Sequence, residues 1–286
     1  IGIDAGTGTD IIGNTGNMLI ESLANTDSVG VSLAVQGTGA GVAGGAVLTR
    51  ATTEATATST GILFAGADTG AEEHDKHKEQ DKDHPHDKPR GHDKHKDKHH
   101  DEDDKFAGDL LFNSGALTVN ADSEAVAVSV GLEVGIALAG VAAGASLTDV
   151  STLSTAGATG IGVSDAGSWI WNEGDLIVDA DADAIGASVS LNVQGAYGVA
   201  AGASLARAIV SADADATGIA GANGMDHIVH SGSIDATSLA DADATSVSAN
   251  ITIGIPLGAA LANTNVTADA NSTGIDAGGA DDWILS

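Results

Sequence analysis

Histidines and carboxylates concentrate in one highly charged tract, residues 72–105, which reads EEHDKHKEQDKDHPHDKPRGHDKHKDKHHDEDDK. Neutral imidazoles beside carboxylates are good ligands for Zn²⁺, Ni²⁺ or Cu²⁺, and the H-x-x-H and H-x-H spacings allow neighbouring side chains to chelate one ion. The tract has too few apolar residues to bury a core, so it predicts a disordered insertion that binds metal weakly. A solvated spacer without a dedicated metal is the alternative. The candidate ligands are His74, His77, His84, His86, His92, His95, His99 and His100.

Aspartates at alternate positions are a second set of candidate cation ligands. In a D-x-D-x-D tract the carboxylates project from the same side of a β-strand. Stacked copies would align them into columns of like charge, and a divalent cation such as Ca²⁺ would relieve the repulsion. A solvated acidic face without an ordered ion is the alternative. The residues concerned are Asp179, Asp181, Asp183, Asp213, Asp215, Asp241 and Asp243.

A further candidate calcium ligand, Asp10, lies in the motif GIDAGTGTDIIGNTG at residues 2–16. The stretch AGTGTDII resembles the nonapeptide G-G-x-G-x-D-x-U-x of RTX-type β-rolls, and this resemblance implies calcium at Asp10. The nonapeptide of β-rolls recurs consecutively so that adjacent turns share each ion, whereas this motif occurs once per repeat and has Ser168 in place of Asp in one copy. A turn in which Asp accepts a local hydrogen bond is therefore the preferred interpretation.

Residues suited to catalysis are sparse. Outside the charged tract the histidines are His227 and His230, the chain has no cysteine, and no nucleophile-elbow, Walker or Rossmann pattern is present. Trp169, Trp171 and Trp283 occupy the hydrophobic triplet of the motif, where packing at a turn is favoured over carbohydrate stacking. We expect a protein that is not an enzyme and requires no cofactor.

Copies of the opening motif begin at Gly2, Gly61, Gly160, Gly218 and Gly274. This spacing indicates a tandem array with a unit of about 58 residues. Residues 1–14 align with 273–286, so we expect a mature or excised segment of a longer protein. The predicted organisation is repeat 1 at 1–60, repeat 2 at 61–159 with the insertion at about 72–105, repeat 3 at 160–217, repeat 4 at 218–273 and the start of a fifth repeat at 274–286.

Strict period-2 alternation follows each motif and predicts β-strands. The acidic and the aliphatic halves of each tract share one parity, so a corner or bulge near Ile185 and Gly186 is expected to separate them. Two all-β architectures fit. A β-solenoid in which each repeat winds through three coils of about 19 residues is preferred. Layered long antiparallel hairpins, or a barrel, are the alternative.

Composition and net charge indicate how the chain packs and which classes of binding partner it can have. Hydrophobic residues make up 42% of the chain but aromatic residues only 2%, which predicts thin, closely spaced layers of small side chains. The net charge of −29 argues against nucleic-acid binding and favours solubility or cation binding. Membrane insertion is not expected, because the hydrophobic stretch 128–147 is interrupted by glycines and contains Glu133.

The openings of the form D-x-I-x-N-x-G, the alternating Ala/Asp tracts and the GVAAGASL-like returns resemble the repeat regions of large bacterial surface and secreted proteins of the adhesin or haemagglutinin type. The resemblance implies an extracellular or cell-surface location and a fibrous, non-enzymatic role. The expected function is a subunit or segment of a filament, sheath or long surface adhesin, with the chain itself as partner in a head-to-tail or lateral homopolymer. A module that binds divalent cations through the acidic faces and the histidine-rich loop is the alternative.

Overall fold

The computed structural model describes residues 1–64, 108–163, 167–279 and 281–286. Every regular element in these ranges is a strand, which confirms the predicted all-β class. Within the same ranges no helix is long and apolar enough to cross a membrane. The strands are β1 (Ile3–Asp4), β2 (Ile11–Asn14), β3 (Met18–Thr38), β4 (Gly41–Leu63), β5 (Asp109–Asn113), β6 (Leu117–Ala137), β7 (Gly140–Gly162), β8 (Ser168–Asn172), β9 (Leu176–Ala220), β10 (His227–His230), β11 (Ile234–Asp276) and β12 (Trp283–Leu285).

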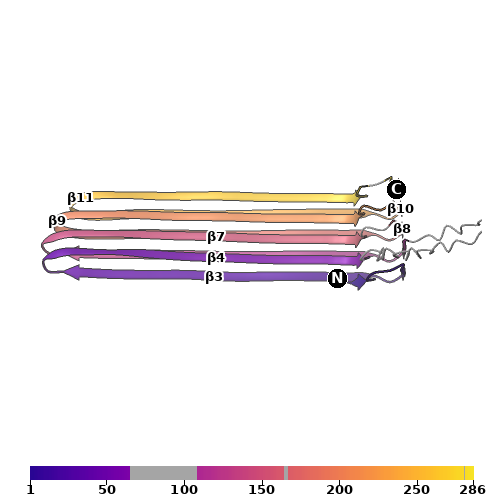
Figure 1. Cartoon of the computed structure of the whole chain (residues 1–286), viewed down its shortest axis with the longest axis horizontal. Coiled ribbons are helices and arrows are strands. Elements are labelled where there is room, and N and C mark those ends of the chain that lie inside the picture. The colour runs from indigo at the N-terminus through magenta and orange to yellow at the C-terminus, as the bar shows by residue number, and fades with distance from the viewer. Residues whose placement is uncertain (65–107, 164–166, 280) are drawn as a thin grey trace, which may run out of the picture.

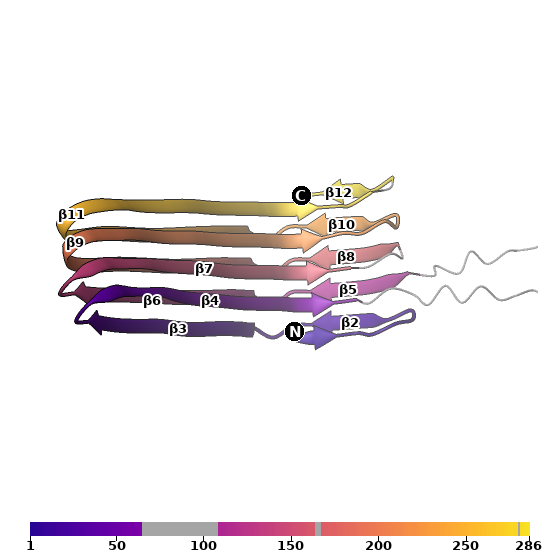
Figure 2. The same cartoon turned by 60° about the vertical axis from the view of Figure 1, so that its left-hand side comes forward.

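Each repeat makes one flat turn, which we call a coil. It consists of a short strand, a long first arm that runs away from it and a long second arm that runs back, as Figures 1 and 2 show. In the second repeat these are β5, β6 and β7, whereas β9 and β11 each contain both arms of one coil and bend at its tip. The first arms are residues 18–38, 117–137, 176–196 and 234–253, and the second arms are 41–63, 140–162, 199–220 and 255–276.

Successive coils pair in parallel and in register. Leu117 of β6 lies between Met18 of β3 and Leu176 of β9, and every first and second arm pairs with its equivalent in the next coil. Equivalent residues that contact each other in successive coils are separated in the sequence by 99, 59, 58 and 56 residues, in order along the stack. The insertion accounts for the longest separation. The short strands form a second parallel sheet in the order β12-β10-β8-β5-β2.

The prediction of three coils of about 19 residues per repeat is wrong. The arms of the second coil are continuous strands of 21 and 23 residues, so a whole repeat closes a single coil. The two arms of a coil run in opposite directions, but the backbone of each arm pairs with the equivalent arms of neighbouring coils rather than with the other arm. The predicted disordered insertion at 72–105, with its eight histidines, lies outside the described residues.

Small side chains fill the interior between the two arms. Ser154 Oγ of a second arm donates a 2.7 Å hydrogen bond to the carbonyl oxygen of Ser123 in the facing first arm. Such direct bonds between the walls require a thin interior, as the Ala-rich composition predicts. The buried alanines of the third coil include Ala180, Ala182 and Ala184 in the first arm and Ala212, Ala214 and Ala216 in the second.

The predicted corner near Ile185 and Gly186 is also wrong. The pairing with β6 continues without a shift through both residues. The acidic and aliphatic halves therefore lie on the same outer surface of one straight arm. The conflict between them is resolved because the aliphatic side chains remain at the surface: Val31 and Leu33 of the first coil are 70% and 64% exposed.

Larger side chains pack where the long arms meet the short sheet. Leu117 and Leu176 of the first arms, Ile161 and Ile219 of the second arms, and Ile170 of the short sheet are fully or almost fully buried in one cluster. This cluster anchors the short sheet against the arms, so the motif residues of successive coils superimpose.

Candidate functional site

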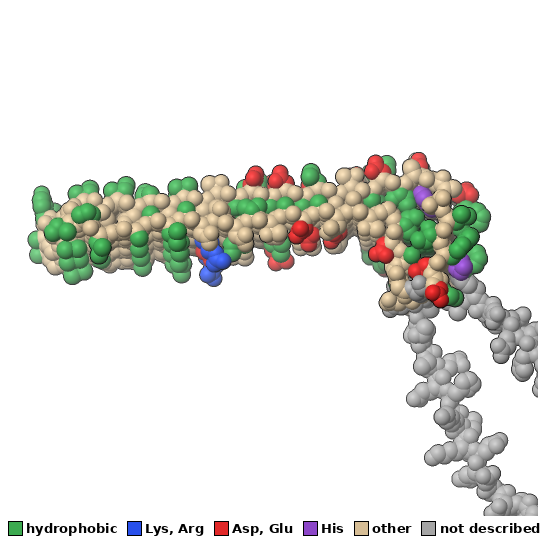
Figure 3. Space-filling model, turned by 90° about the horizontal axis from the view of Figure 1, so that it is seen from above, with side chains coloured by type: hydrophobic (Ala, Val, Ile, Leu, Met, Phe, Trp, Pro, Cys, Tyr) green, Lys and Arg blue, Asp and Glu red, His purple; other side chains and the backbone are tan. Residues whose placement is uncertain are grey.

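Columns of carboxylates run along the outer surface of the first arms, in the half nearest the short sheet (Figure 3). Asp181 pairs in register with Asp122, and Asp183 lies between Glu124 and Asp241. Burial, followed by the charges of neighbouring aspartates, raises the pKa of Asp181 and of Asp183 above 3.8. The charged carboxylates therefore lower the stability of the folded state. Protonation restores this stability as the pH falls through the raised pKa values.

The predicted calcium ligands do not form one cluster. Asp179 and Asp243 lie at the two ends of the same acidic surface, beside Asn120 and Ile185. Asp213 and Asp215 belong to the second arm, on the opposite surface, where burial and the charges of Asp215 and Asp269 raise the pKa of Asp213. Asp122 and Glu124, which join the columns, were absent from the predicted ligands although they occupy equivalent positions one repeat earlier.

Within the described ranges, no group of three or more histidine or acidic side chains has the geometry of a metal centre. Calcium binding by the acidic columns stays a prediction. Metal binding by His74 to His100 concerns residues outside the described ranges.

The aspartates of the opening motif link one coil to the next. Asp109 Oδ1 accepts a 2.9 Å hydrogen bond from the backbone N–H of Asp10, and Asp226 Oδ1 accepts one of the same length from Ser168 N–H. Asp282 Oδ1 accepts the equivalent bond from Asp226 N–H, at 2.9 Å. The carboxylate in this position thus accepts a hydrogen bond from the neighbouring coil rather than the local bond that the sequence predicted, and Asp10 Oδ2 is buried without a partner.

The asparagine of the motif forms a buried ladder. Asn14 Nδ2 donates to Asn113 Oδ1 at 2.7 Å, and Asn113 Nδ2 donates to Asn172 Oδ1 at 2.5 Å. In the fourth coil the ladder ends on a histidine, because Asn172 Nδ2 lies 2.8 Å from His230 Nδ1. Sequence reasoning recorded the three asparagines without a role; their recurrence at one motif position was the available signal.

His230 makes the ladder sensitive to pH. Its side chain is 8% exposed, and burial lowers its pKa below 6.5. The unfolded chain therefore binds a proton at a higher pH than the folded chain, so stability is lost as the pH falls through 6.5 toward the lowered value.

Replacing His230 with Asn should remove this pH dependence, because Asn occupies the equivalent position in the other three complete coils. Near pH 8 we expect the free energy of unfolding of His230→Asn to lie within about 1 kcal/mol of the wild-type value. On acidification to about pH 5.5 the variant should lose less stability than wild type. Urea denaturation at both pH values measures this. An unchanged difference between the two pH values would contradict the assignment.

Aromatic side chains form an exposed column on the short sheet. The Trp169 and His227 rings stack with centroids 4.6 Å apart, and Trp283 lies beyond His227 at 6.0 Å. The two tryptophans are 43% and 51% exposed. Each tryptophan therefore packs against the His227 ring between them, along the stack, and stays partly exposed to solvent.

The far half of the interior holds polar side chains, among them a buried glutamate. Glu133 is fully buried between the arms, and neither carboxylate oxygen has a hydrogen-bond partner. Burial raises its pKa above 4.5. Glycines of the facing second arms make room for this row, since a Cβ on Gly144 would lie 2.9 Å from Glu133 Cγ. Sequence reasoning did not single out Glu133 as a site, because alternation alone does not show which parity faces inward.

No family model, curated protein or solved structure matches this chain.

Proposed function

We propose that this chain is a structural repeat segment of an extracellular filament, sheath or long surface adhesin. The observation that carries the proposal is the in-register stacking of one coil per repeat, which can continue without limit along the stack. The extracellular location follows the resemblance to bacterial surface repeats.

The outermost coils supply the surfaces for growth. Among the described strands, β3 pairs with β6 alone and β11 with β9 alone, so both leave a long backbone edge open. Open edges of this length are templates for pairing with another chain. In the second arm of β11, Ala268 is exposed although its equivalent in the previous coil, Ala212, is 1% exposed. A further coil would bury it.

Two copies joined in register would compete at the junction. Ile3 and Ile275 occupy equivalent positions, at the two ends of one row of second-arm residues. Ile11 and Trp283 likewise occupy equivalent positions at the two ends of the short sheet. Residues 1–14 of one copy and 273–286 of the next would thus occupy the same place. We therefore expect removal of residues 1–14 to accelerate end-to-end growth.

Electron microscopy and fibre diffraction of the purified chain test the proposal. We expect fibres with a repeat of about 4.7 Å along the axis, because the strands lie across it. Ala268→Lys should prevent growth by placing a charge inside the next coil, whereas Thr267→Lys, which adds the same charge on the outer surface, should not. Compact monomers under all conditions, or equal growth of both variants, would rule out end-to-end stacking.

A second candidate function is cation binding by the acidic columns. The specific observation is the direct pairing of Asp122 with Asp181 and of Asp183 with Asp241, carboxylates that repel one another at neutral pH. We expect calcium to raise the Tm of wild type by several degrees.

The double variant Asp181→Asn, Asp183→Asn should melt higher than wild type without calcium and respond less to it, since neutral amides no longer repel. Differential scanning calorimetry with and without calcium distinguishes these outcomes. A calcium-induced shift of about one degree or less in wild type would leave only a solvated acidic surface.

A further inference from the structure

The outer surface of the first arms is uncharged in its half near the coil tips. We call this surface the distal face, and define it as the outward-facing residues of 29–37, 128–138, 187–197 and 245–253. They are mostly Val, Leu and Ile, and they align across the coils into straight columns such as Val31, Val130, Val189 and Val247. Figure 3 shows hydrophobic side chains gathered at this end, away from the acidic residues.

The distal half has its polar residues inside and its aliphatic residues outside. Ser190, Asn192 and Gln194 are buried between the arms, whereas Val193 and Leu191 alternate with them and point outward. Burying polar groups while aliphatic side chains stay in water is unfavourable for an isolated coil. The arrangement becomes favourable when another apolar surface covers the distal face.

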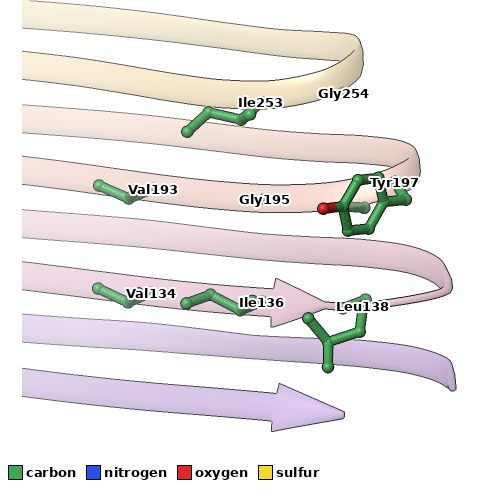
Figure 4. Close-up of a pocket in the computed structure, with 10 residues that line it drawn as sticks. Val134, Ile136, Leu138, Val193, Gly195, Tyr197, Ile253 and Gly254 are labelled. Atoms are coloured by element: carbon green, nitrogen blue, oxygen red, sulfur yellow. The ribbon is translucent and has the colours of Figure 1, made fainter. Parts of the chain in front are cut away.

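A notch marks the middle of the distal face near the tips, as Figure 4 shows. Gly195 pairs with Ile136 on one side and Ile253 on the other, so the row has no side chain between these two isoleucines. A Cβ on Gly195 would meet no atom within 4 Å. The resulting apolar hollow has a volume of about 490 Å³ and is bordered by Leu138 and Tyr197, which is 90% exposed.

We propose that the distal face binds the distal face of a second copy. The long arms of the two molecules point in opposite directions, so that only the halves near the coil tips overlap. Flat sheets with matching ridges pack well face to face, about 10 Å apart. The charge distribution selects the antiparallel arrangement. A parallel overlap would place the acidic columns of the two copies against each other, whereas tip-to-tip overlap directs them to opposite ends.

The size of the distal face is sufficient for a specific contact. Five outward positions along each arm span about 30 Å and four coils about 20 Å, so each copy covers roughly 600 Å². This lies at the lower limit of stable interfaces and grows with each added coil. A lipid bilayer would cover the face less well, because the open edges of β3 and β11 would leave backbone groups unpaired in hydrocarbon. The proposal is independent of end-to-end growth.

Analytical ultracentrifugation of the full chain over a concentration series tests this proposal. Leu191→Lys places a charge in the centre of the distal face and is expected to weaken dimerisation about tenfold or more. Thr58→Lys, which adds the same charge to the exposed outer surface of a second arm, should dimerise like wild type. Ala268→Lys should also dimerise, because it blocks only the end of the stack.

Small-angle X-ray scattering checks the arrangement. Tip overlap predicts a maximum dimension about one and a half times that of the monomer, since roughly half of each arm is shared. A wild type that stays monomeric, a Leu191→Lys variant that dimerises like wild type, or a dimer no longer than the monomer would overturn the proposal. Flotation of a monomeric chain with phosphatidylcholine vesicles would assign the face to lipid instead.

Discussion

Replacing Gly174 with Ala is expected to lower the free energy of unfolding by about 3 kcal/mol. Gly16, Gly115, Gly174 and Gly232 form one column at the turn between the short strand and the first arm. A Cβ on Gly174 would overlap the carbonyl oxygen of Gly115 in the preceding coil. That oxygen is part of the backbone, so the clash is relieved only if two coils move apart. Chemical denaturation followed by circular dichroism measures the effect.

Gly13→Ala is the matched control. Gly13 lies in β2 of the same short sheet, and a Cβ there would meet no atom within 4 Å. We expect this variant to be as stable as wild type or slightly more stable, because Ala restricts the unfolded chain. If Gly174→Ala and Gly13→Ala have the same stability, the coils are not in the close contact described for this column.

Replacing Glu133 with Asn should stabilise the chain at neutral pH by about 1 to 3 kcal/mol. The substitution removes a buried carboxylate whose oxygens have no partner. It also extends an existing row, because Asn192 and Asn250 occupy the equivalent positions of the next two coils. Their amides donate to the carbonyl oxygens of Ala203 and Gly202, each at 2.9 Å. By equivalence, we expect the amide of Asn at position 133 to donate to the carbonyl oxygen of Ala145, which pairs with Ala203.

The sign of the pH dependence provides a separate check on Glu133. Its pKa is raised in the folded state, so the folded chain retains a proton that the unfolded chain loses near pH 4.5. Its contribution to stability therefore falls as the pH rises from 4.5 through the raised value. The advantage of Glu133→Asn over wild type should be smallest in acid and grow across this window.

Glu54→Asn is the control for Glu133→Asn. Glu54 is exposed on the outer surface of β4, so this substitution should change stability by about 0.5 kcal/mol or less at any pH. Equal effects of the two substitutions would mean that the Glu133 carboxylate reaches water. A destabilised Glu133→Asn would mean that the carboxylate has a favourable partner inside the fold.

Local sequence features predicted much of the fold. The alternation of Asp179 to Asp183 with alanines identified a strand and placed these carboxylates on one side of it. The recurrence of the opening motif set the distances at which equivalent residues meet. Parallel pairing of equivalents then aligns Asp181 with Asp122, because both stand at the same place in the repeat. These properties depend on neighbours along the chain and on the repeat length.

The predictions that were wrong concern which side of each strand faces the interior, and this depends on the arm that packs against it. The corner at Ile185 was predicted because an aliphatic run was expected to be buried, yet period-2 alternation is the same whichever parity faces inward. The choice is made by the facing arm. Gly144 and Gly202 leave space there for Gln194 and Asn250, so the polar parity turns inward. No local signal in 176–196 contains this information.

The sequence by itself determined that this protein is a tandem β-repeat with acidic strands, because strand period and repeat length are properties of the chain. Tertiary structure decided that one repeat makes one coil, because straight arms of more than 20 residues close only after both have been completed. It also decided that the aliphatic columns lie outside. The role of the motif at residues 2–16 is likewise visible only in the tertiary structure. Its Asp, Asn and Gly hold successive coils in register through hydrogen bonds and close backbone contact.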